Sequence, residues 1–113
     1  MPPKTDAKTV FSGLTVSFLR SCPRIVDNVI WDTVDYYFRV EREGDSREVA
    51  VGIDGDWQDR LSSTELQKIA ETWLLHRLEH FYQPFREPRT YSRMTHVPFD
   101  VVDFWLAHRR LPH

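Results

Sequence analysis

The segment from Ser62 to Tyr82 constrains the fold most, because it has the pattern of one amphipathic helix. Ser62 and Glu65 stand three residues apart as a capping box, which predicts a helix start at this point. Apolar side chains then recur at steps of three and four residues, so they lie on one side of a helix. They are Leu66, Ile69, Ala70, Trp73, Leu74, Leu78 and Phe81. Pro84 ends the pattern, because proline lacks an N–H and disfavours helical geometry in the preceding residue.

The residues before this helix alternate between apolar and polar side chains, which is the two-residue period of β-strands. The alternation is present in residues 14–18, 34–41 and 49–53. Gly44-Asp45-Ser46 predicts a hairpin turn between the last two of these strands. We expect Ser21-Cys22-Pro23 to end the first strand. The strands together form an antiparallel meander with one apolar face, which the helix is expected to cover.

Residues 24–33 fit two structures, since their apolar positions have a helical spacing whereas their β-branched side chains favour strand. We interpret them as strand, with a turn at Asp27-Asn28. A last helix is predicted from Pro98 to Leu111, because proline suits the first turn of a helix.

The predicted fold class is therefore α+β: an antiparallel sheet of three to four strands followed by two helices, the first packed across one sheet face. We assign residues 1–8 as a mobile N-terminal lead-in and residues 9–113 as a single α+β domain.

Composition excludes several classes of protein. The single cysteine, Cys22, permits no internal disulfide and no zinc site built from several thiolates, and it favours a cytoplasmic location. No stretch approaches the roughly 18 apolar residues of a membrane helix. The four glycines are too scattered for a loop that cradles phosphate. We expect a small soluble protein that has no cofactor and does not bind a membrane.

The segment Pro84–Pro98 has no periodicity and is longer than the typical connection of about 4–6 residues. Its aromatic side chains alternate with arginines, and both residue types anchor protein interfaces or bind nucleic acid. Residues 84–113 hold five arginines against three acids, whereas residues 1–60 hold eleven acids against eight bases. Such a dipolar chain is suited to pairing with itself.

The last predicted helix is apolar around most of its circumference, so part of it is expected to contact another molecule. We predict a non-catalytic protein–protein interaction module that self-associates as a homodimer through this helix and the aromatic and arginine-rich loop. The predicted partner-binding residues are Tyr82, Phe85, Arg86, Arg89, Tyr91, Arg93, Trp105 and Arg109. The alternative hypothesis is nucleic-acid binding through Arg86, Arg89, Arg93, Arg109 and Arg110.

The helix at 62–82 also carries residue types that occur in catalytic and metal-binding sites. His76, Glu79 and His80 have the H-x-x-E-H spacing of an inverted zinc protease, so a metal-dependent hydrolase is the remote alternative. Such enzymes need a third ligand and a larger body, and we assign no catalytic or metal-binding residue. Arg77 falls inside the apolar stripe beside His80 and one turn after Trp73. These three residues form a candidate buried polar site, in which the charge must reach solvent or pair with a carboxylate.

Overall fold

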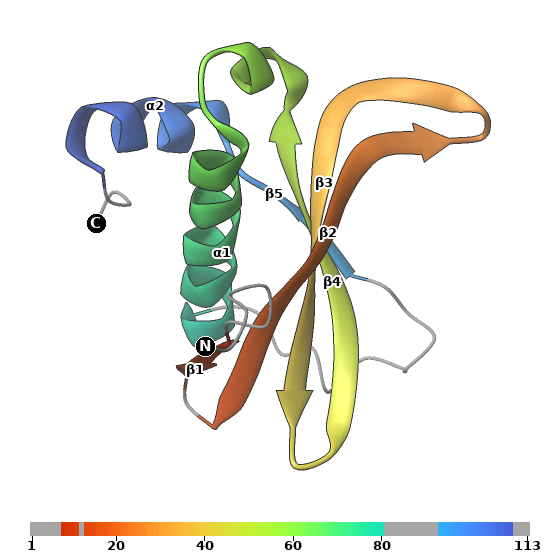
Figure 1. The fold of residues 1–113 in the computed structure, drawn as a ribbon, viewed down its shortest axis with the longest axis vertical. Helices are drawn as coiled ribbons and strands as arrows, with labels where there is room; N and C mark the ends of the chain where they lie inside the picture. Colours follow the sequence, from red (N-terminus) through yellow and green to blue (C-terminus); the bar gives the residue numbers. More distant parts are fainter. Residues whose placement is uncertain (1–7, 12, 81–92, 110–113) are drawn as a thin grey trace, which may run out of the picture.

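The computed structural model describes residues 8–11, 13–80 and 93–109, which form one twisted sheet and two α-helices (Figure 1). The strands follow chain order across the sheet, and their bounds are β1 Lys8–Phe11, β2 Leu14–Val26, β3 Val29–Arg42, β4 Asp45–Asp54 and β5 Arg93–His96. Helix α1 spans Ser63–His80 and α2 spans Phe99–His108, and a short 3-10 helix, Gly55–Asp59, connects β4 to α1.

The predicted α+β class is confirmed, because antiparallel strands precede two helices and α1 packs on the sheet. Strands β1 to β4 are antiparallel neighbours, whereas β5 lies parallel to β4 and pairs Gly52 with His96. The sequence pattern did not indicate β1 or β5. Each has only four residues, which is too short for a two-residue period to stand out.

The predicted break at Ser21-Cys22-Pro23 is wrong, because β2 continues to Val26. The register with β3 shifts between Phe18 and Arg20 and again between Pro23 and Ile25, as at β-bulges. A proline is tolerated in this part of β2 because β1 pairs only with residues 14–17, which leaves one edge of β2 open among the described residues.

The turn predicted at Asp27-Asn28 is present. Asp27 has φ of 52° and Asn28 has φ of 65°, which is the left-handed geometry of a two-residue hairpin turn. Aspartate and asparagine tolerate this region better than other residues that carry a side chain.

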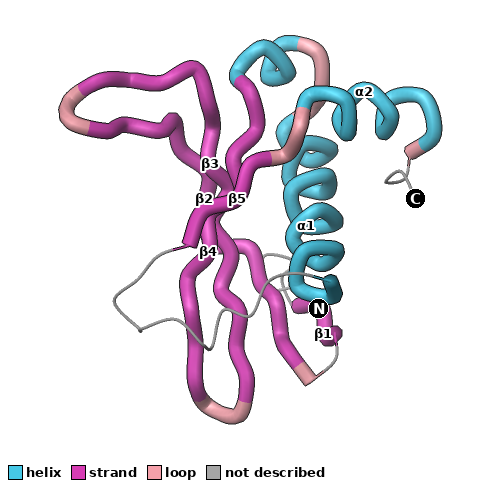
Figure 2. The backbone as a smooth tube through the Cα atoms, turned by 180° about the vertical axis from the view of Figure 1, so that it is seen from behind, coloured by secondary structure: helices cyan, strands magenta, loops and turns pink. Residues whose placement is uncertain are grey.

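The core lies between α1 and one face of β3 and β4. Both helices lie on the same side of the sheet (Figures 1 and 2). The predicted cap is confirmed, since the Glu65 N–H donates to the Ser62 hydroxyl oxygen at 3.2 Å. The largest fully buried side chains are Trp57, Phe38, Ile53, Leu66, Ile69, Leu74, Val16, Val40, Val49, Val51, Val97 and Val102.

We predict that Tyr36 makes the fold sensitive to alkaline pH. Its side chain is buried and its hydroxyl donates to Gln58 Oε1 at 3.3 Å, and burial raises the pKa of the phenol above its ordinary value of 10.0. The unfolded phenol ionises first, so the free energy of unfolding should fall as pH rises above about 10. Urea denaturation at about pH 8 and about pH 10.5 measures this fall, which should be smaller in Tyr36→Phe. An equal fall in both proteins would contradict the prediction.

Candidate functional site

The ends of β2 and β3 extend beyond the rest of the sheet as a two-stranded ribbon, which we call the hairpin arm (residues 25–31). Ile25 pairs with Ile30 and Val26 pairs with Val29. Strand β4 pairs with β3 only from Thr33 onward. Neither edge of the hairpin arm therefore has a partner strand in the described part of the chain, and the arm projects away from the helices (Figure 1).

The hairpin arm exposes five large apolar side chains. Their exposed fractions are 62% for Ile25, 45% for Val26, 58% for Val29, 72% for Ile30 and 52% for Trp31. Directly paired residues share a face and successive residues alternate, so Ile25 and Ile30 lie on one face and Val26 and Val29 on the other. Elsewhere among the described residues, only Phe99 is a comparably exposed large apolar side chain, at 53%. Contiguous exposed apolar surface of this kind marks binding sites.

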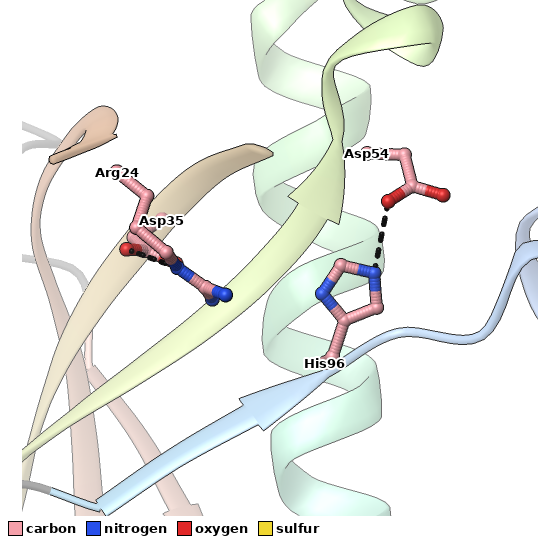
Figure 3. Close-up of polar contacts among 4 residues, drawn as sticks. All are labelled: Arg24, Asp35, Asp54 and His96. Atoms are coloured by element: carbon pink, nitrogen blue, oxygen red, sulfur yellow. Dashed lines mark hydrogen bonds and ion pairs between the residues drawn. The ribbon is translucent and has the colours of Figure 1, made fainter. Parts of the chain in front are cut away.

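At the base of the hairpin arm, Arg24 is held by a buried carboxylate. Its Nε lies 3.2 and 3.1 Å from the two oxygens of Asp35, and its Nη2 donates to Oδ1 at 2.7 Å (Figure 3). Asp35 is 1% exposed. These hydrogen bonds raise the pKa of the Arg24 guanidinium above its ordinary value, against the opposing effect of burial. The pair fixes the first residue below the arm to β3.

A second polar contact lies across β4 from the first. His96 Nε2 is 3.0 Å from Asp54 Oδ1, and Figure 3 shows the Arg24 guanidinium pointing toward this histidine. Arg24 and His96 can both lie close to the β4 backbone because residue 52 is a glycine. A Cβ built on Gly52 would lie 2.5 Å from Arg24 Nη2 and 3.0 Å from His96 Nδ1. The first contact joins β2 to β3 and the second joins β4 to β5. Because each basic side chain already faces its own carboxylate, this polar cluster offers no excess positive charge to an anion.

The predicted partner-binding residues fall into two groups. Tyr82, Phe85, Arg86, Arg89 and Tyr91 lie outside the described residues, as does Arg110 of the nucleic-acid alternative; only the backbone of Arg93 is described, in β5. Trp105 and Arg109 are described and lie together beside the start of α1. Trp105 is largely buried, and Arg109 forms an ion pair with Glu65.

The candidate polar site on α1 is described in part. The Trp73 ring stacks on His76 at 5.7 Å between centroids, and the Arg77 guanidinium carbon lies 5.9 Å from the Trp73 ring centre. The side chains of Glu79 and His80 lie outside the described residues. Within the described ranges, no three His, Cys, Asp or Glu side chains gather as metal ligands would.

The hairpin arm is the feature that sequence reasoning did not identify as a site. The pattern was available, since residues 25–31 place apolar side chains on both sides of a strand pair. Such a strand is either buried on both faces or exposed for binding, and sequence alone does not decide between the two.

Comparisons with known proteins give no functional lead. No protein-family model matches the chain, and no curated protein matches it.

Neither described helix has the length and apolar character needed to cross a membrane.

Removing Arg24 should lower the free energy of unfolding more than neutralising Asp35 does. Arg24→Met leaves the buried Asp35 carboxylate without its partner and should cost about 3 kcal/mol of unfolding free energy. Asp35→Asn should cost less, about 1 to 2 kcal/mol, because Arg24 is partly exposed and can turn toward water. Urea denaturation of the two variants tests the order, and a larger loss for Asp35→Asn would contradict it.

Gly52→Ala should destabilise the protein through Arg24. The added methyl group would force Arg24 away from Asp35, at a cost of about 1 to 3 kcal/mol. In an Arg24→Met background the same substitution should cost less, because the closest clashing atom is gone. Strict additivity of the two losses, measured by urea denaturation, would show that Arg24 does not carry the effect.

Proposed function

We propose that this chain is a non-catalytic protein-binding module that acts through the hairpin arm and that includes its own kind among its partners. The observation that carries this proposal is the exposure of five large apolar side chains on both faces of a projecting ribbon. The proposed setting is the cytoplasm, which a single cysteine favours.

Burial of the hairpin arm by a partner is energetically favourable for two reasons. Burial of apolar surface is favourable by about 25 cal/mol for each Å² removed from water. An exposed tryptophan such as Trp31 is also typical of interface anchors. The open ribbon edges also carry backbone groups that an added strand can pair with. A partner that contacts both a face and an edge uses both contributions.

The charges of the hairpin arm favour protein over nucleic acid. The apolar side chains are interrupted by Asp27 and followed by Asp32, and both acids are exposed. Acidic side chains repel phosphate, whereas they complement a basic protein surface. Arg109, the described side chain of the nucleic-acid alternative, is already paired with Glu65.

Site-specific photo-crosslinking tests the proposal. A photo-reactive amino acid placed at Ile30 of the full chain should give discrete crosslinked protein bands in an extract of the source cells, which mass spectrometry identifies. The same amino acid at Phe99 is the matched control, because Phe99 is also a large exposed apolar side chain, at 53% against 72% for Ile30, but lies outside the arm. The bands should disappear in Ile25→Thr/Trp31→Thr, which keeps strand propensity while removing apolar surface.

Two results would overturn the proposal: no product at Ile30 above that at Phe99, or a product that persists in the double variant. The melting temperature of Ile25→Thr/Trp31→Thr should stay within a few degrees of the original protein, because exposed positions contribute little to folding.

A further inference from the structure

The N-terminal turn of α1 and the last turn of α2 enclose a groove of about 390 Å³. Figure 1 shows α2 beside the N-terminal end of α1, on the side of the molecule away from the hairpin arm. We call this the α1–α2 groove, and its lining residues are Ser62, Thr64, Glu65, Lys68, Trp105 and Arg109.

Trp105, one of the residues that line the α1–α2 groove, has a buried hydrogen-bond donor without an acceptor. Trp105 is 4% exposed, and its indole Nε1 has no acceptor in the described structure. Buried indole N–H groups normally find an acceptor, so the unpaired donor of Trp105 is an exception to that rule.

The electrostatics of the α1–α2 groove favour an acidic occupant. Glu65 and Arg109 pair with each other, so the net charge of +1 among the lining side chains comes from Lys68. The N-terminal end of α1 adds the partial positive charge of its backbone N–H groups.

The tip of the hairpin arm has the complementary chemistry. Asp27 stands at its turn, with Val26 and Val29 beside it, so one carboxylate is surrounded by exposed apolar side chains. We propose that the α1–α2 groove receives the hairpin arm of a second copy of this chain, with Asp27 placed against Lys68. This inference rests on the proposed protein-binding function of the arm.

The positions of arm and groove favour exchange between two copies. Both lie at the same end of the molecule but on opposite sides, so an arm cannot fold back into the groove of its own chain (Figure 1). Reciprocal insertion of two arms into two grooves closes a twofold dimer. Each contact then contains one arm and one groove, from different protomers.

A charge-based cycle tests the contact on the full chain. Lys68→Glu should raise the dimer dissociation constant at least about tenfold, measured by sedimentation equilibrium, because it places two acids together. In an Asp27→Asn background the same substitution should have a much smaller effect, and asparagine tolerates the left-handed turn. Arg39→Glu, which changes an exposed charge outside both surfaces, is the matched control and should leave the constant unchanged.

Mixing two variants distinguishes arm-to-groove exchange from arm-to-arm pairing. Val26→Thr/Val29→Thr lacks the apolar side chains beside Asp27 and Lys68→Glu lacks a functional groove, so each alone should be mostly monomeric. A mixture should form heterodimers, because one intact arm can still enter one intact groove. Melting temperatures close to that of the original protein show that both variants remain folded.

Three results would overturn the exchange: a monomer at every concentration, equal effects of Lys68→Glu with and without Asp27, or no heterodimer in the mixture. If the purified chain is monomeric while Ile30 crosslinks to a different protein, the exchange and the proposed self-association fail, and the binding of another protein through the hairpin arm stands. If Ile30 gives no specific crosslink, the proposed function fails as well.

Discussion

The structure depends on the burial of one apolar sheet face by α1. Tyr36, Phe38 and Val40 of β3 point toward that helix together with the alternating valines of β4. A meander of this kind has no stable alternative in water, because its apolar face must be covered by another layer. The Ser62 cap fixes where α1 begins. The 3-10 helix adds Trp57 to the same core.

Features carried by a repeated local pattern could be predicted from the sequence. The cap at Ser62, the alternation along β3 and the turn at Asp27-Asn28 each have a physical signature in neighbouring residues. Strand β5 could not be predicted, because its pairing with β4 depends on a parallel contact distant in the chain. Pro23 misled the prediction, since a proline ends a strand only where its missing N–H is needed.

The candidate site was predictable only in part, for a related reason. Sequence shows which side chains are apolar, but exposure depends on how far each neighbouring strand extends. Trp105 was assigned to partner binding from its helix pattern, and the structure places it in the core with its indole at a groove wall. Asp35 lies on the polar side of β3, yet Arg24 buries it, which alternation alone does not indicate.

The continuity of β2 and β3 has a mechanical consequence. Each strand runs without interruption from the helix-covered core to the tip of the arm, so the arm is an extension of the core. Its position relative to the core is set by the β2–β3 pairing, which shifts register between Pro23 and Ile25, and by the Arg24–Asp35 contact below it. Because its backbone is already paired as a ribbon, the arm loses less conformational entropy on binding than an irregular loop of the same length would.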